Sequence, residues 1–376
     1  MNLQQPWTIR DYQMKKSFLL PAIALIAVSC SKPADNFIWE RTFGEGAAYF
    51  IKTTPDSGIV SGGKTNGSPY LIKLRKDKST AFEFRSSRNG LFSSVWFNTS
   101  FYVAGGSSNG MMLLACFGKD GTMIWDTLLA AGFKIRTTGL VFSGNGNIAA
   151  VGSAMPDSVE TGSSGILFVR FDTAGNIMQK KETTEANFAA AGKITDDLSG
   201  NILIPLTRKK PYSKAQASVA KYSYEFNKLW ETDLYNNTDF GAASRGIISD
   251  AQGNVYVAGN TELASGESVL NTSFLVSLSP SGSLRWKKYL EKTNSGTALI
   301  FDENGSLMML NANCFIVNLA DPADGSDEGI IRMFDVCNSK ETDVSGNDLD
   351  LFYDGNILVA GSKGGTYYLA LKSFQQ

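Results

Sequence analysis

One short pattern recurs along this chain and constrains its fold more than any other feature. A turn is followed by an apolar run of strand length, which in most copies closes on a glycine. The copies close at residues 62, 105, 152, 206, 259, 311 and 361, so the intervals are 43, 47, 54, 53, 52 and 50 residues. A period of this length is typical of arrays in which one supersecondary unit is repeated. The sequence therefore predicts seven copies of one small structural unit.

Each copy contains more than the first hairpin. A second apolar or β-branched run follows, which we expect to be the third strand of the unit. These runs lie at residues 70–74, 113–117, 167–171, 218–222, 274–278, 315–319 and 367–371. A turn and an outer strand come next, with Trp125, Trp230 and Trp286 at matching positions. The pattern predicts an all-β fold, a seven-bladed β-propeller of four-stranded antiparallel blades.

The last unit ends too early for a fourth strand. Residues 37–43 read like the outer strands of the other units, with Trp39 at the tryptophan position. We therefore predict that this N-terminal outer strand pairs with residues 367–371, completes the last blade and closes the ring. Closure of this kind leaves few unpaired strand edges.

The N-terminal region has the composition of a secretory signal. Lys15 and Lys16 precede an apolar run at residues 18–28, which is too short to span a bilayer. A buried core helix is the alternative, but Pro21 interrupts the run. Residues 27–30, Ala-Val-Ser-Cys, resemble the lipobox of bacterial lipoproteins, although leucine is commoner where Ala27 stands. The resemblance implies lipidation of Cys30 and anchoring in a membrane through that lipid.

The chain thus divides into three parts. Residues 1–29 are an upstream extension and signal peptide, residues 30–36 a lipidated cysteine and tether, and residues 37–376 one propeller domain. The repeated sequence over residues 37–374 resembles the β-propeller repeats of surface lipoproteins from Bacteroidetes-type bacteria, and more distantly the quinoprotein-like propellers. That resemblance implies blades and carries no activity with it.

Composition excludes several kinds of chemistry. The chain has no histidine, which removes Ser-His-Asp and Cys-His catalysis and histidine-ligated zinc. Without residues 1–29, Lys and Arg total 32 against 35 Asp and Glu, so no nucleic-acid partner is expected. The acidic loop at residues 321–328 could supply oxygens to calcium, but its spacing does not match an EF-hand and a solvated turn is the simpler interpretation. We predict no catalytic residue, no cofactor and no metal site.

Cysteine usage suits an oxidising compartment. Cys314 stands just before a third strand and Cys337 just after the following strand, where antiparallel pairing brings the two ends together. They are candidates for a disulfide, the alternative being two separate thiols. Cys116 lies in a third strand and is expected to be a small core residue.

Uneven loop lengths indicate which face of the propeller binds a ligand. The connections at residues 154–165, 207–217 and 260–273 are long in three successive units and should lie on one face. Basic and aromatic side chains gather there and in the adjoining link at residues 235–240. The candidate binding residues are Arg208, Lys209, Lys210, Tyr212, Tyr235, Phe240 and Glu262.

These observations favour a monomeric, exported, non-enzymatic module that is anchored to the outer membrane and binds or scaffolds a protein or glycan ligand. Two alternatives stay open. One is a carboxylate-based glycosidase or lyase, which would need two acids within about 5 to 10 Å of each other. The other is an outer-membrane assembly scaffold.

Overall fold

The computed structural model separates the chain into two compact units, residues 1–35 and residues 36–376, and only the second is described below. The structure describes residues 37–142, 147–154, 165–184, 188–208, 214–235, 241–265, 268–290, 295–313, 315–319, 322, 330–335 and 343–373. All regular secondary structure within these ranges is β-strand.

The described strands form antiparallel sheets of four to seven strands. The largest has the order β26-β27-β28-β1-β2-β3-β4. Its strands are β1 (Phe37–Thr53), β2 (Ile59–Thr65), β3 (Ser68–Leu74), β4 (Thr80–Arg85), β26 (Val344–Leu351), β27 (Ile357–Lys363) and β28 (Thr366–Lys372).

The other sheets follow one another along the chain, each with its strands in sequence order. The next two contain β5 (Gly90–Phe97), β6 (Phe101–Ser108), β7 (Met111–Gly118) and β8 (Met123–Leu129), then β9 (Ile135–Phe142), β10 (Ile148–Ala154), β11 (Gly165–Phe171) and β12 (Ile177–Thr184). The five-stranded sheet contains β13 (Phe188–Ala191), β14 (Thr195–Asp196), β15 (Ile202–Arg208), β16 (Gln216–Tyr222) and β17 (Lys228–Tyr235). The last two contain β18 (Ala242–Ser249), β19 (Val255–Ser265), β20 (Ser268–Leu278) and β21 (Leu284–Leu290), then β22 (Gly296–Phe301), β23 (Leu307–Asn311), β24 (Phe315–Leu319) and β25 (Ile330–Asp335).

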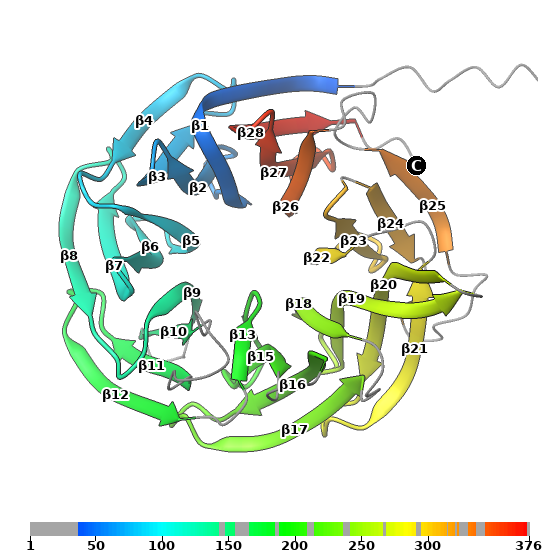
Figure 1. Ribbon diagram of the computed structural model, residues 1–376. Coiled ribbons are helices and arrows are strands. Elements are labelled where there is room, and N and C mark those ends of the chain that lie inside the picture. Colours follow the sequence, from blue (N-terminus) through cyan, green and yellow to red (C-terminus); the bar gives the residue numbers. More distant parts are fainter. Residues whose placement is uncertain are drawn as a thin grey trace, which may run out of the picture. The chain divides into compact units, whose positions relative to one another are not determined.

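These sheets stand radially around a common axis, so the fold is an all-β propeller (Figure 1). The first strand of each sheet lies nearest the axis and the last forms the outer wall. Apolar side chains of neighbouring sheets pack against each other, and the core is divided into clusters between them. Cys116, buried to 1% exposure, belongs to one such cluster, and burial raises the pKa of its thiol to about 11. Its predicted role as a core residue is confirmed.

Strand β1 joins the two ends of the chain. Its first half pairs with β28, which places Trp39 opposite Leu371 and Thr42 opposite Tyr368. Its second half turns inward and pairs with β2 from Gly46 onward. The predicted pairing of residues 37–43 with the last strand is confirmed.

Three outer-strand tryptophans, Trp125, Trp230 and Trp286, each connect their sheet to the next one. The indole Nε1 of Trp125 donates to the Thr173 carbonyl at 3.3 Å, and that of Trp230 to the Pro280 carbonyl at 3.2 Å. Both indoles lie on a turn glycine with positive φ: a Cβ on Gly282 would come 2.8 Å from the Trp230 ring. Glycine is needed there both for its backbone conformation and for the close approach of the ring.

The innermost strands share a register irregularity. A β-bulge occurs near the start of β5, β9, β13, β18, β22 and β26, and in β1 it occurs between Ala48 and Phe50, shortly after pairing with β2 begins. A bulge leaves one residue unpaired and increases the local twist. Its recurrence at one position of the innermost strand shows that the repeat extends to backbone detail.

The two edges of the propeller are formed by different connections between strands. Turns after the first and third strands of neighbouring sheets touch each other: Lys76 lies 4.1 Å above the Tyr353 ring, and Asn147 contacts the Tyr224 hydroxyl. We call this edge the turn face. Links between sheets meet the second-to-third connections at the opposite edge, where the Ile135 amide donates to the Gly110 carbonyl at 2.7 Å. We call that edge the loop face.

One of the predicted long loops is mostly strand. Residues 260–273 continue the ladder between β19 and β20, and pairing runs on to Ser265 opposite Ser268. The expectation of an irregular loop was wrong here because a longer hairpin satisfies the backbone amides and carbonyls that a loop would leave to solvent. The hairpin of β19 and β20 projects beyond the neighbouring strands (Figure 1), and Glu262 within it contacts Lys214 and Tyr235 of the preceding sheet.

Candidate functional site

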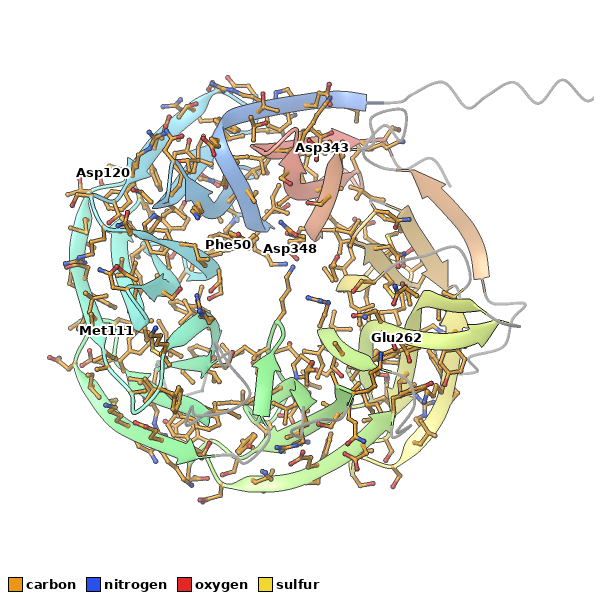
Figure 2. The ribbon with its side chains drawn as sticks, viewed as in Figure 1. Phe50, Met111, Asp120, Glu262, Asp343 and Asp348 are labelled. Atoms are coloured by element: carbon orange, nitrogen blue, oxygen red, sulfur yellow. The ribbon has the colours of Figure 1, made fainter. Side chains whose placement is uncertain are left out.

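Two aspartates of β26 lie on the side of the strand that faces β1. The strand ends in Asp348-Leu349-Asp350-Leu351, and in a strand alternate side chains point to the same side. Leu349 is buried in the core between sheets, so Asp348 and Asp350 point away from that core. Figure 2 shows Asp348 at the inner end of its strand, close to the axis.

Two lysines from other strands approach these acids. Lys52 of β1 places its Nζ 3.9 Å from Asp348 Oδ2 and 3.8 Å from Asp350 Oδ1. Lys193, between β13 and β14, places its Nζ 2.5 Å from Asp348 Oδ1 and donates to the Asn347 carbonyl at 2.5 Å. We call Lys52, Lys193, Asp348 and Asp350 the axial cluster. It brings two positive and two negative charges together.

Lys193 reaches its partner from a distant part of the ring. The sheet of β13 packs against the sheets of β9 and β18, and β26 packs against β1 and β22. Lys193 and Asp348 therefore belong to sheets that are not neighbours. The Lys193 amide donates to the Arg245 carbonyl at 2.8 Å, which fixes the backbone from which this side chain extends.

The same aspartates also hold the backbone of β1. Asp348 Oδ2 accepts from the Ile51 amide at 3.0 Å, and Asp350 Oδ2 accepts from the Thr53 amide at 2.6 Å. The side-chain amide of Asn347 donates to the Ala48 carbonyl at 2.8 Å. Side chains of β26 thus satisfy backbone groups on the edge of β1 that faces away from β2. The cluster lies on the seam between the first and last parts of the chain.

The pKa values of the two acids in the axial cluster are shifted in opposite directions. Burial would raise the pKa of Asp348, but Lys193 and Lys52 together with the Ile51 amide hold it below the ordinary value. Burial dominates at Asp350 and raises the pKa of that carboxyl. The pKa of Lys193 is lowered, chiefly by burial, whereas Asp348 and Asp350 outweigh burial and raise the pKa of Lys52. Asp348 is therefore the fixed negative charge of the cluster.

The predicted binding residues that the structure describes do not form one group. Arg208 makes an ion pair with Glu231 at 2.6 Å. The Tyr235 hydroxyl donates to the Glu262 carbonyl at 3.3 Å, and Tyr235 is only 8% exposed. The Glu262 carboxylate accepts from Lys214 and from the Gly241 amide, each at 3.0 Å. Tyr235 and Glu262 are thus brought together on the loop face, with Arg208 held separately by Glu231.

Several other predictions fall outside the described residues: Cys30, Lys209, Lys210, Tyr212, Phe240, Cys314 and Cys337. The acidic loop at residues 321–328 also falls outside them, apart from Pro322, whose carbonyl accepts from Trp286 Nε1 at 3.0 Å. Within the described ranges, no three Cys, Asp or Glu side chains gather as a metal ion would require. Those ranges also contain no helix long and apolar enough to cross a membrane.

Sequence reasoning missed the axial cluster. A signal was present, because the alternation Asp-Leu-Asp-Leu in an innermost strand puts two acids on one side of it. Nothing in the sequence connects these acids to Lys193, which is 155 residues away along the chain.

Comparison with known proteins identifies the fold. No family model matches the sequence, and no curated protein sequence is significantly similar to it. Solved structures do match: the Pan2 WD40 domain of Neurospora crassa has a TM-score of 0.60 at 10% identity and covers 88% of this chain and 90% of its own. The WD40 β-propeller domain of Doa1 gives 0.59 at 10% identity, with 91% and 97% covered. Streptogramin B lyase gives 0.61 at 11% identity, with 89% and 98% covered.

These likenesses place the chain among the β-propeller proteins. At such low identity they establish its fold alone, because one fold supports many unrelated functions.

Proposed function

We propose that this chain is a non-enzymatic cell-envelope lipoprotein whose propeller binds or scaffolds a protein or glycan. The observation that carries the proposal is the pairing within the axial cluster. Asp348 is held by two lysines and the Ile51 amide, and Asp350 by Lys52 and the Thr53 amide. Charges that compensate one another in this way hold a ring together, and a rigid ring presents its loops to a ligand.

We propose seven blades for this ring. The seven-stranded sheet divides naturally within β1, where pairing with β28 ends at Glu45 and pairing with β2 begins at Gly46. Each half then has four strands. The bulge shared by the innermost strands, at intervals that follow the sequence repeat, supports the same count.

The proposed anchor is the lipid on Cys30, after removal of residues 1–29, with the propeller exported to the outer membrane. Its support is the order of Lys15, Lys16, the apolar run and Cys30 in the sequence. Mass spectrometry of the mature N-terminus tests it directly. A peptide beginning at an acylated Cys30 is expected, and Cys30→Ser should release the protein from membranes. An unmodified residue 30 in membrane-bound protein would overturn the anchor.

The proposed ligand surface is the loop face around Arg208, Lys209, Lys210, Tyr212, Tyr235, Phe240 and Glu262, in a monomer. Residues 31–376 should bind a subset of ligands on a glycan array, or capture a protein of the cell envelope. Lys209→Ala with Lys210→Ala should weaken capture, because a cluster of positive charge attracts anionic ligands. The matched control is Lys119→Ala with Lys76→Ala on the turn face. Hydrolysis of a glycan without stable binding would overturn the proposal.

One observation favours a second candidate, a carboxylate-based glycan-active enzyme. Asp348 and Asp350 share a side of β26, and their pKa values are displaced in opposite directions. Acid and base roles are assigned to acid pairs by such a difference. If the chain hydrolyses a glycan, Asp350→Asn should abolish turnover while leaving the fold intact. Retained turnover in that variant would exclude Asp350 from the chemistry.

A further inference from the structure

Where the structure describes side chains, many of the exposed large apolar ones lie at one edge of the propeller. Among the side chains that the structure describes, one large apolar residue that is at least 40% exposed, Tyr289, lies toward the loop-face end of an outer strand. The others lie at the turn-face edge. They are Ile38, Met123, Ile124, Phe142, Ile177, Met178, Leu198, Leu229, Leu284 and Tyr353.

Most of this group stands where an outer strand begins. Ile124 and Leu229 each directly precede a docking tryptophan, and Met178 precedes Gln179, which donates to the Glu225 carbonyl of the next sheet at 3.3 Å. Since alternate side chains of a strand point to opposite sides, a residue next to one that docks on the neighbouring sheet points away from it. Ile124 is 61%, Met178 60% and Leu229 52% exposed. More than half of each of these apolar side chains is therefore left in contact with solvent among the described residues.

These positions form an arc along one rim. Successive sheets contribute Ile124 from β8, Met178 from β12, Leu229 from β17 and Leu284 from β21 (Figure 1). A globular partner placed beside the wall would contact the outer strands of one or two sheets. A planar surface beneath the turn face can contact the whole arc at once. The distribution therefore fits a flat partner.

The first described strand of the propeller begins at the same rim. β1 begins at Phe37 as an outer strand, so its first residues lie at the turn-face edge, and Ile38 is 50% exposed there. The residues before it include Cys30 and the apolar run at 18–28. A tether from Cys30 thus joins the ring at the rim where the apolar side chains lie. This step rests on the proposed lipid anchor, whereas the arc itself does not.

The charges of the turn face indicate which headgroups suit it. In the described turns, carboxylates such as Asp120, Asp172 and Asp354 outnumber the basic side chains, among them Lys76 and Lys119. Asp120 accepts from the Thr122 amide, and Asp172 accepts from the Asn176 side-chain amide and from backbone amides of its turn, which lowers the pKa of each carboxyl. A strongly anionic surface would repel such a face.

We infer that the turn face rests on a zwitterionic lipid bilayer, with the apolar arc inserted among the headgroups and the loop face directed away from the membrane. The arrangement combines one lipid chain with a weakly inserting protein surface, and stable anchoring generally needs two such signals. It also determines which face of the propeller is free for a ligand.

Vesicle sedimentation with residues 31–376 tests the inference without the lipid. This segment contains the whole unit 36–376, including the strand that closes the ring. It should partition onto phosphatidylcholine–phosphatidylethanolamine vesicles. The variant Ile124→Ser, Met178→Ser, Leu229→Ser, Leu284→Ser should bind at least about 100-fold more weakly, since partial burial of each side chain contributes up to about tenfold. Tyr289→Ser, at the other edge, should bind as the parent does. All three should unfold at similar temperatures.

The outcomes separate this inference from the proposed anchor. Absence of binding by residues 31–376, or equal binding by the fourfold variant, overturns the inference even if mass spectrometry finds a lipid on Cys30. If residues 31–376 bind vesicles through the arc and the full chain is never acylated in its host, the inference is supported and the lipid anchor is overturned. Binding that requires phosphatidylglycerol and disappears in high salt would overturn the zwitterionic assignment.

Discussion

Lys193 and Asp348 meet near the axis of the propeller, with 2.5 Å between Nζ and Oδ1, although they belong to sheets that are not neighbours. The Asp348 side chain is 6% exposed and the Lys193 side chain 32%. Such a pair ties one side of the ring to the other. It acts beside the backbone pairing of β1 with β28, which closes the ring at its outer wall.

Removing one partner of this pair should destabilise the protein asymmetrically. Asp348→Asn leaves both lysines without their shared charge and weakens the bond from the Ile51 amide, so we expect a loss of about 2 to 4 kcal/mol. Lys193→Met should lose less, about 1 kcal/mol, because Lys52 still faces Asp348 and Lys193 is partly exposed. Urea unfolding at pH 7 measures both. Equal small losses would contradict the assignment of Asp348 as the centre of the cluster.

The pH dependence of stability should follow Asp348. Because its folded pKa is lowered, its contribution is fully present above the unfolded value near 3.9 and disappears as pH falls through the folded value. Between pH 5 and pH 2, by the usual range for such carboxyls, the parent should lose more stability than Asp348→Asn. Denaturant titrations at several pH values give both curves. Parallel curves would show that other carboxyls control acid unfolding.

A turn glycine should tolerate alanine only where no tryptophan covers it. Gly282 has φ +85° and lies against Trp230, whereas Gly355 has φ +78° with no atom within 4 Å of an added Cβ. Gly355→Ala should cost about 1 to 2 kcal/mol from backbone conformation alone. Gly282→Ala should cost about 1 to 3 kcal/mol more, because the indole must move. Thermal unfolding compares the two variants. Equal losses would mean that the ring contact does not constrain this turn.

Removing the first half of β1 should open the ring. A chain that begins at residue 44 lacks Trp39 and Phe43, and Phe43 packs edge-on against Tyr367 at 5.6 Å. We expect a loss of several kcal/mol and aggregation through the exposed edge of β28. Light scattering and calorimetry should show this relative to a chain that begins at residue 36. A shortened chain that stays monomeric and equally stable would contradict closure through β1.

The proposed disulfide between Cys314 and Cys337 has a separate test. Its flanking strands β24 and β25 are paired, with Phe315 opposite Asp335. Peptide mapping of protein from an oxidising compartment should recover the two cysteines linked. The bond would contribute roughly 3 kcal/mol by closing a loop of about 24 residues. Cys116, which is buried, should resist alkylation until the protein unfolds and serves as the internal control. Free Cys314 and Cys337 in that material would refute the pair.

The sequence by itself determined the repeated unit, its strands and the closing role of residues 37–43. These features are local: apolar runs, turn glycines and Trp125 or Trp230 recur at matching positions, and each strand pairs mainly with its neighbours in sequence. Even the ring closure could be predicted, because the last unit lacks one strand and the first residues supply it.

Only the tertiary structure decided what lies at the axis. Lys193 and Asp348 are far apart in sequence and belong to sheets that are not neighbours, so their pairing depends on how the sheets are placed around the axis. The extension of β19 to Ser265 and the arc that begins at Ile124 were equally hidden. Charge pairing and exposed rims arise when separate units are placed around a common axis, and the spacing of residues in the chain does not contain that placement.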